Sequence, residues 1–366
     1  MNLLTGINGR RKSSLLQSLL LLSQTFRKKK TPLQLLINGE WVKLGSFDDL
    51  KNRDLGNDTF FIKIKTDDSE KNVILFEYGE LQSNERIAEL RSLKIDGKDM
   101  FVETGEEESG ETTHSSKSLD PLDSIKTFSL FYKFHFITAD RIGPVEYVRK
   151  TDDTIDSMPT GIRGENVINI LAYNGDFFLV NKNIVIGEKY DLLTQTKEWL
   201  SYILDGTNIE IKKDRISSIL SVTLNSKTSS HLYKPANVGF GHSYILPLVV
   251  VGLIAKTGDT VIIENPEAHL HPRAQARLTE FFVKIAGTGV QVFTESHSEH
   301  ILNSMRVCSL KKDFALTNKE MSVIYFDENY KNIPLAIDES GRISNLPDGF
   351  FDQQEIDLVQ IFNLAK

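Results

Sequence analysis

The sequence predicts an α/β fold built around a parallel sheet, and residues 260–300 show this most clearly. The apolar run 261–263 is short enough for a buried strand and meets acid at once in Glu264. A helical pattern follows over residues 273–285, and a second apolar strand, 290–293, ends in polar residues. Because polar residues at the carboxyl ends of successive strands are typical of ligand sites in parallel sheets, we expect the chemistry at this edge.

The N-terminal segment predicts a phosphate-binding loop. A short apolar strand runs into Gly6, and a leucine-rich helix follows over residues 15–22. Such a loop needs a lysine for the outer phosphates and a hydroxyl for Mg²⁺ at a helix N-terminus, and Lys12 and Ser13 fit these roles. The pattern G-x-x-x-x-G-K-[ST] is incomplete, because Arg11 stands at the second glycine, where a side chain tends to obstruct close approach of phosphate.

Together, the two segments resemble the P-loop ATPases of the ABC type, which include SMC proteins, double-strand-break repair ATPases and OLD-like ATPases. More narrowly, the chain is similar to a bacterial family of predicted AAA/ABC-type ATPases with a C-terminal domain of unknown function. The stretches that carry this resemblance span nearly the whole chain: GINGRRKSSLLQSLLLL, LINGEWVKLGSFDDL, ITADRIGP, GIRGENVINILA, KPANVGFGHSYILP, ENPEAHLHPRAQ, ESHSEHILN and LPDGFFDQ.

The resemblance implies an α/β P-loop NTPase of the ABC-ATPase-head type with an antiparallel β-subdomain, a helical lobe and a small C-terminal extension. Residues 1–140 would hold the P-loop and β-subdomain, 141–235 the helical lobe, and 236–325 the signature, Walker B and switch motifs. Residues 326–366 would form the extension.

The resemblance also assigns site residues. Glu264 takes the place of the Walker B carboxylate, usually an aspartate, which holds Mg²⁺ through water, while Ser13 supplies a hydroxyl to the metal. Asn265 stands where relatives carry the glutamate that polarises the attacking water. An amide can orient that water but cannot accept its proton, so slow or differently catalysed hydrolysis is expected, with Glu267 as the nearest substitute. The nucleotide-binding loop comprises Gly6, Asn8, Gly9, Arg11, Lys12, Ser13 and Ser14.

A second nucleotide-contacting element is implied by residues 237–243, which look like the signature motif. In the family's dimer this motif closes over the nucleotide held by the other subunit, here through Gly239, Gly241 and Ser243. We expect Ser243 to cap the apolar helix that follows it. His297 matches the switch histidine that reads the γ-phosphate, and residues 268–272 match the dimer-contacting loop.

The resemblance implies ATP and Mg²⁺ as ligands, a homodimer and a separate effector protein, in bacterial anti-phage defence or DNA maintenance. The net charge of −7 does not indicate a DNA-binding surface, although a local basic patch could still contact DNA. A single cysteine, Cys308, suits the cytoplasm. Because the longest apolar runs fall short of the roughly 20 residues of a membrane helix, no membrane partner is expected.

The alternative function is a degenerate, non-hydrolysing nucleotide sensor or scaffold. Arg11 and Asn265 favour it, as does Met1, which lies five residues before Gly6 where relatives have leading strands.

Several residues keep two interpretations. The basic run 27–30 suits a nucleic-acid contact or a solvated helix end. Arg141 suits a contact with phosphate or a partner subunit, or a structural salt bridge with Asp140 or another acid. Phe350 and Phe351 suit core anchors or a docking patch. Four histidines suit either a metal-binding cluster or the loops of the ATPase: His269, His271, His297 and His300.

Outside the motifs, residues 33–81 alternate apolar runs with turns and predict antiparallel strands, with Gln34 as a candidate Q-loop glutamine. Residues 103–118 predict a solvated loop and 128–138 a core strand. Helices are expected at 164–173, 190–204 and 214–222.

Overall fold

The computed structural model describes residues 1–7, 9, 12–51, 56, 58–65, 73–104, 116–119, 128–151, 160–214, 216–225, 231–344, 346–347 and 349–365. The chain forms two compact units. Unit 1 comprises Met1–Ser13 and His135–Lys366, and unit 2 comprises Ser14–Phe134.

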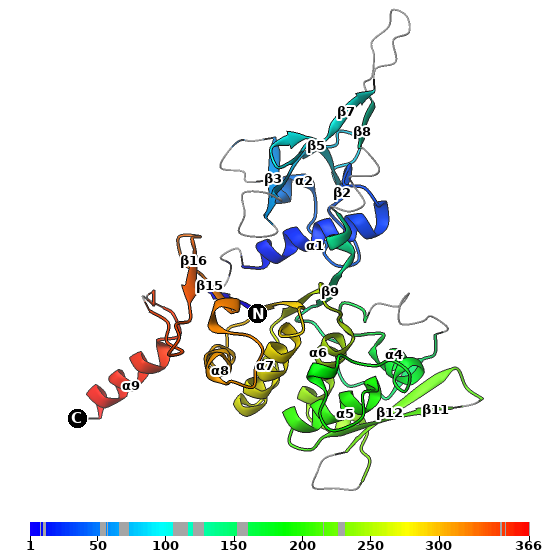
Figure 1. The fold of residues 1–366 in the computed structure, drawn as a ribbon, viewed down its shortest axis with the longest axis vertical. Helices are drawn as coiled ribbons and strands as arrows, with labels where there is room; N and C mark the ends of the chain where they lie inside the picture. Colours follow the sequence, from blue (N-terminus) through cyan, green and yellow to red (C-terminus); the bar gives the residue numbers. More distant parts are fainter. Residues whose placement is uncertain are drawn as a thin grey trace, which may run out of the picture. The chain divides into compact units, whose positions relative to one another are not determined.

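Unit 1 is organised by a six-stranded sheet with the order β16-β15-β1-β14-β13-β9. Figure 1 labels its strands β9, β15 and β16. Strands β15, β1, β14 and β13 pair in parallel, so their carboxyl ends meet at one edge, and β16 pairs with β15 in the antiparallel direction. The predicted parallel sheet is confirmed. Its strands are β1 Asn2–Gly6, β9 Phe134–Ile137, β13 Thr260–Glu264, β14 Gln291–Glu295, β15 Ser322–Phe326 and β16 Asn332–Ala336.

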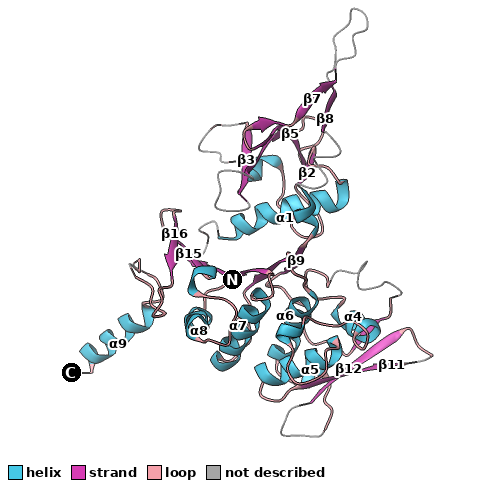
Figure 2. Ribbon diagram, viewed as in Figure 1, coloured by secondary structure: helices cyan, strands magenta, loops and turns pink. Residues whose placement is uncertain are grey.

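The helices that follow these strands bury apolar faces in the core of unit 1. Helix α7 packs against α6 and α8 (Figure 2). Phe281 of α7 is fully buried against Trp199, with ring centroids 4.8 Å apart. The run that forms α6 is apolar all round because that helix is buried on nearly every side. The bounds are α6 Phe240–Ile254, α7 Pro272–Ala286 and α8 Glu299–Leu310.

The segment expected to be a helical lobe also contains a three-stranded antiparallel sheet. The expected helix at residues 214–222 is wrong, because residues 219–225 form a strand whose buried side chains alternate along the chain: Leu220, Val222 and Leu224. The elements are β10 Tyr147–Arg149, α4 Val167–Asn174, α5 Leu192–Ile203, β11 Asn208–Lys213 and β12 Ile219–Asn225, in the sheet order β10-β12-β11.

Unit 2 combines most of helix α1, Lys12–Lys29, with an antiparallel sheet, as the sequence predicts. The sheet pairs β2 Gln34–Leu36, β5 Ile87–Ile95, β4 Val73–Glu80 and β3 Thr59–Lys65 in this order, with β6 Lys98–Asp99 on β5; α2 is Phe47–Leu50. Arg27 of the basic run is structural, since its guanidinium donates to the carbonyls of Tyr132 and Phe134 at 2.8 Å each.

Two other expectations for this region need correction. The stretch 128–138 opens as the 3₁₀ helix Ser129–Tyr132, and only its end is strand. The ends of the expected loop 103–118 belong to a hairpin of β7 Phe101–Thr104 and β8 Ser116–Leu119, while residues 105–115 lie outside the described part.

The C-terminal segment adds β16 and helix α9, Gln353–Leu364, to unit 1. Phe350 is 6% exposed and packs edge-on against Tyr325 at 5.4 Å, so the expectation of a core anchor is confirmed for this residue. Among the described residues, no helix has the length and apolar character needed to cross a membrane.

Candidate functional site

The backbone at the end of β1 turns sharply at Gly6. Its φ of 132° suits glycine, and a Cβ atom there would lie 2.3 Å from the carbonyl oxygen of Phe326. The Ile7 N–H donates to the same carbonyl at 3.2 Å. Asn8 and Arg11 lie outside the described residues, and helix α1 begins directly after them at Lys12.

Lys12 is buried in this turn, with 3% of its surface exposed. Its ammonium donates to the carbonyls of Gly6 at 3.0 Å and Ile7 at 2.8 Å. Burial lowers the Lys12 pKa, and the nearby charge of Glu295 partly opposes this shift. A cation therefore stands at the N-terminus of an 18-residue helix, where backbone N–H groups and the helix dipole favour phosphate. Gly9 and Ser14 flank it and are exposed.

Ser13 contacts a carboxylate that sequence reasoning did not select. Its hydroxyl donates to both Glu295 oxygens, each at 3.1 Å. Glu295 is the last residue of β14 and is 7% exposed, and burial raises its pKa while the Ser13 hydrogen bond lowers it. The available signal was the acid itself, which follows an apolar strand as Glu264 does.

The Glu264 carboxylate has other partners. Its Oε2 accepts hydrogen bonds from the Thr138 hydroxyl at 3.0 Å and the Ala139 N–H at 3.1 Å, both just beyond β9. The structure thus links Ser13 with Glu295, whereas the sequence paired Ser13 with Glu264. The metal-binding role of Glu264 stays a prediction.

Arg141 holds the loop after β13. It is 1% exposed, and its guanidinium donates to the carbonyls of Glu264 at 2.9 Å and Asn265 at 2.7 Å. Burial lowers its pKa to about 10, so it is charged at neutral pH. The expected pair with Asp140 is wrong, since Asp140 pairs with Arg163 at 3.2 Å. Asn265 has a φ of 42°, a left-handed conformation that asparagine tolerates better than glutamate.

Glu267 connects this loop to the predicted switch. Its Oε1 accepts the backbone N–H of His297 at 2.9 Å, whereas its buried Oε2 has no partner among the described residues. His297 is exposed, and its pKa is lowered by partial burial and by the charge of Lys12, while Glu267 opposes the shift. This hydrogen bond connects the loop after β13 to the loop after β14.

The signature segment begins helix α6 earlier than expected. Gly239 is the N-cap and Phe240 the first helical residue, so the expected cap at Ser243 is wrong: this residue lies inside the helix. A Cβ atom on Gly241 would lie 2.8 Å from the His269 carbonyl oxygen, so glycine allows α6 to approach the loop after β13. Pro247 also lies within α6 and has no N–H to donate to the Ser243 carbonyl.

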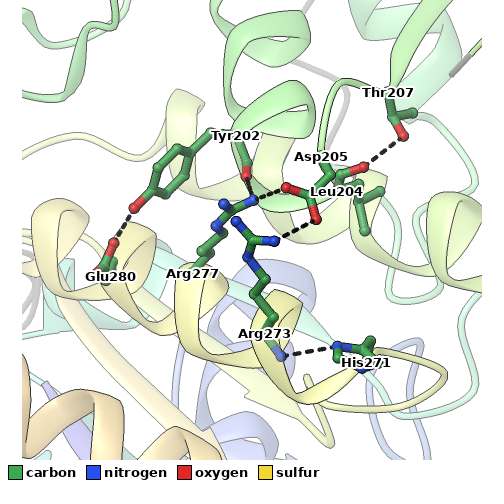
Figure 3. Close-up of polar contacts among 8 residues, drawn as sticks. All are labelled: Tyr202, Leu204, Asp205, Thr207, His271, Arg273, Arg277 and Glu280. Atoms are coloured by element: carbon green, nitrogen blue, oxygen red, sulfur yellow. Dashed lines mark hydrogen bonds and ion pairs between the residues drawn. The ribbon is translucent and has the colours of Figure 1, made fainter. Parts of the chain in front are cut away.

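A cavity of about 520 Å³ lies beside the start of α6. Its lining includes Asp205, Phe240, His242, His269, His271 and Arg273. Figure 3 shows the polar contacts that stabilise the wall of this cavity formed by Asp205 and Arg273. Asp205 accepts from Arg277 at 2.7 Å and lies 3.6 Å from Arg273, and the Tyr202 hydroxyl donates to Glu280. These contacts tie the end of α5 to α7.

The histidines fit the ATPase-loop interpretation better than a metal centre. His271 caps α7 by accepting the Arg273 N–H at 3.3 Å, and His269 stacks edge-on against Tyr244 at 4.6 Å. Within the described part of the chain, no three histidine, cysteine or acidic side chains are grouped to hold a metal ion.

The residues present fit Mg·ATP. A buried ammonium at a helix N-terminus suits the phosphates, and a serine hydroxyl in contact with a buried carboxylate supplies the oxygen ligands that Mg²⁺ prefers. When bound, Mg²⁺ neutralises charge that develops on the phosphate oxygens.

We predict that Arg141→Lys lowers the free energy of unfolding of unit 1 by about 2 kcal/mol, because an ammonium cannot bridge both carbonyls as the planar guanidinium does. Urea unfolding followed by Trp199 fluorescence, in a Trp41→Phe background, would measure this loss. The control is Arg163→Lys at the exposed Asp140 pair, for which we expect at most about 1 kcal/mol. Equal losses in the two variants would contradict a positioning role for Arg141.

Solved structures of SMC heads are similar to the chain at low identity. One SMC head bound to the C-terminal winged-helix domain of ScpA is 10% identical, with a TM-score of 0.45, covering 93% of this chain and 91% of that chain. The SMC head domain from Thermotoga maritima is 8% identical, with a TM-score of 0.41 and coverages of 92% and 90%. A Pyrococcus furiosus SMC head bound to the C-terminal domain of ScpA is 10% identical, with a TM-score of 0.44 and coverages of 100% and 93%.

No curated protein matches the sequence. Two family models do. Residues 316–361 match "Protein of unknown function (DUF3696)". Residues 1–303 match the model described as "AAA domain, putative AbiEii toxin, Type IV TA system", which spans the phosphate loop, both site strands and the signature helix. The chain therefore belongs to this AAA-domain family of P-loop ATPases and carries the DUF3696 module at its C-terminal end.

Proposed function

We propose that the chain binds Mg·ATP, closes into a homodimer over two nucleotides, and thereby controls a partner protein, with hydrolysis resetting the dimer. The observation that carries this proposal is the buried Lys12 ammonium at the start of α1, next to the Ser13–Glu295 contact. Among the described residues, the Lys12 ammonium donates to two backbone carbonyls and has no carboxylate within ion-pair distance. A negative charge in direct contact stabilises a buried ammonium, and a bound phosphate would supply one.

Dimer closure rests on the exposed start of α6. Gly239 is exposed, and Phe240 is 53% exposed at the first turn of this 15-residue helix. Such a terminus favours an anion, and in a two-fold dimer it would face the nucleotide of the other subunit. The cavity beside it, lined by His269 and His271, gives the partner's loop or phosphates room to enter.

We propose the biological setting from the family description, which names a putative toxin of a type IV toxin–antitoxin system. Such a system has two components, which supports a role with a separate effector in bacterial anti-phage defence or DNA maintenance. The single cysteine is compatible with the cytoplasm.

We expect Lys12→Ala to weaken Mg·ATP binding by at least about tenfold, because the variant removes the charge that faces the phosphates. Calorimetric titration of ATP into the full chain measures this change. Lys28→Ala, an exposed lysine on the same helix, serves as the matched control and should bind like the wild type. Unchanged affinity in Lys12→Ala, or no saturable binding by the wild type, would contradict the proposed nucleotide site.

The dimer is tested at Gly239. A Cβ atom there would lie 3.9 Å from Nδ1 of His242, its nearest neighbour among the described residues, so Gly239→Asp and Gly239→Asn should both fold, and both are good N-caps. The aspartate places a negative charge where the partner's phosphate would bind, whereas the asparagine does not. Light scattering with saturating Mg·ATP should find dimers for the wild type and the asparagine variant and monomers for the aspartate variant. A wild type that stays monomeric would refute dimer closure.

A second candidate function is a nucleotide sensor that binds ATP without hydrolysing it. Asn265 favours it, because its amide cannot take a proton from water and its left-handed backbone disfavours glutamate. Wild-type chain that binds Mg·ATP and dimerises without releasing phosphate would establish this alternative.

For the hydrolysing form, we predict that Asn265→Glu raises the rate of phosphate release by about 10²-fold, the lower end of what a positioned general base contributes. Asn265→Gln has the same length and the same backbone strain but no base, so its rate should stay near that of the wild type. A colorimetric phosphate assay measures both rates. Equal rates for the glutamate and glutamine variants would show that position 265 does not face the attacking water.

A further inference from the structure

We propose that Thr138 is a positioning residue for the Glu264 carboxylate and holds it ready for Mg²⁺. The inference rests on the nucleotide site of the proposed function and adds to it a residue that follows β9, the neighbour of β13 in the sheet. The observation that carries it is the hydrogen bond from the Thr138 hydroxyl to Oε2 of Glu264 at 3.0 Å. The Ala139 N–H donates to the same oxygen at 3.1 Å.

Glu264 lies at the edge of the sheet that carries the candidate site. It is opposite Glu295 in the register of β13 and β14, and Glu295 accepts the Ser13 hydroxyl. Burial is the main cause of the raised Glu295 pKa, and the charge of Glu264 adds to it, so the two carboxylates are close enough to interact. Because like charges repel, donors to Glu264 help to keep its carboxylate at this edge.

The nearby cation does not take over this task. Arg141 donates to the main-chain carbonyl of Glu264 at 2.9 Å, so it fixes the backbone and leaves the carboxylate to the donors that follow β9. Those two donors share Oε2. Among the described residues, Oε1 of Glu264 accepts no hydrogen bond, so it is the oxygen that remains for the metal or for a water of its shell.

The two donors are held in place independently of Glu264. The Thr138 N–H donates to the Ile162 carbonyl at 2.8 Å, and the Ile142 N–H donates to the Arg163 carbonyl at 2.9 Å. Threonine is also stiff at χ1, because its Cβ atom is branched. A glutamate that is already oriented by fixed donors loses less conformational entropy when it binds a metal, which is how partners of metal ligands raise metal affinity.

The test compares Thr138→Val, which removes the hydroxyl at nearly constant shape, with Thr138→Ser, which keeps it. ATP affinity is measured by calorimetry on the full chain with excess Mg²⁺ and with a chelator, and the ratio of the two affinities gives the metal contribution. We expect Thr138→Val to lower this ratio by about tenfold, the lower end of what loss of such a partner costs, and Thr138→Ser to retain most of it. Affinity with the chelator should stay that of the wild type in both variants.

The matched control is Thr279→Val, at a buried threonine of α7 whose hydroxyl donates to the Gln275 carbonyl at 2.9 Å. Its ratio should equal that of the wild type, and thermal melting checks that every variant is folded. Glu264→Gln should lower the ratio, because a neutral amide is a poor ligand for a hard cation. Adding Thr138→Val to Glu264→Gln should lower it no further, because Thr138 acts through the carboxylate.

An unchanged ratio in Thr138→Val would overturn the assignment, as would an equal loss of affinity with and without Mg²⁺. Effects of Thr138→Val and Glu264→Gln that multiply in the double variant would overturn it too, since they would show that the two residues act independently. A wild type that binds ATP equally with and without Mg²⁺ would refute this inference and leave the nucleotide site standing. A wild type that binds no ATP would refute both.

Discussion

The candidate site depends on the parallel pairing of β1 with β14. This pairing joins the beginning of the chain to residues almost 300 positions later, with Asn2 opposite Phe293 and Leu4 opposite Glu295. It is reinforced where the Ser296 N–H donates to the Leu4 carbonyl at 3.0 Å. Because Leu3 and Leu4 are fully buried, the core specifies this register, and a shift by one residue would turn both the strand and its loop away from Glu295.

The loops after β13 and β14 form the other half of the candidate site, and hydrogen bonds to their main chain hold them in place. Arg141 binds two consecutive carbonyls, and Glu267 binds one N–H of the next strand's loop. These contacts are made to main-chain atoms, so they do not depend on the side chain at position 265. The left-handed backbone at Asn265 does depend on it, because asparagine tolerates that conformation better than glutamate does.

Local sequence patterns predicted the strand–helix–strand core well, because residues 260–295 have clean periodicity and strong stop signals at their ends. They failed at residues 214–222, where Ile216, Ile219 and Leu220 have helical spacing. The alternation of Leu220, Val222 and Leu224 was the correct signal. Antiparallel pairing with β11 favours the strand over the helix here. Ile216 is 99% exposed, so it contributes nothing to an apolar face.

Contacts between distant parts of the chain are the second reason why sequence patterns failed, here at the candidate site. Ser13 and Glu295 are 282 residues apart, and only the lateral order of the strands brings them together, which no local pattern contains. The start of α6 was missed because Gly239 caps it with its backbone conformation alone, without the polar side chain that usually marks a cap.

Pro247 gives the signature helix two mechanically different parts. Seven residues of α6 precede it, and the missing donor leaves the Ser243 carbonyl without its usual bond from the next turn. The first turns are therefore joined to the rest of the helix by fewer hydrogen bonds than elsewhere, although Gly241, Ile245 and Leu246 within them are buried. Helices bend most readily where a hydrogen bond of the ladder is missing. A force applied at the exposed Phe240 would therefore bend α6 near Pro247 before it displaced the fully buried residues beyond.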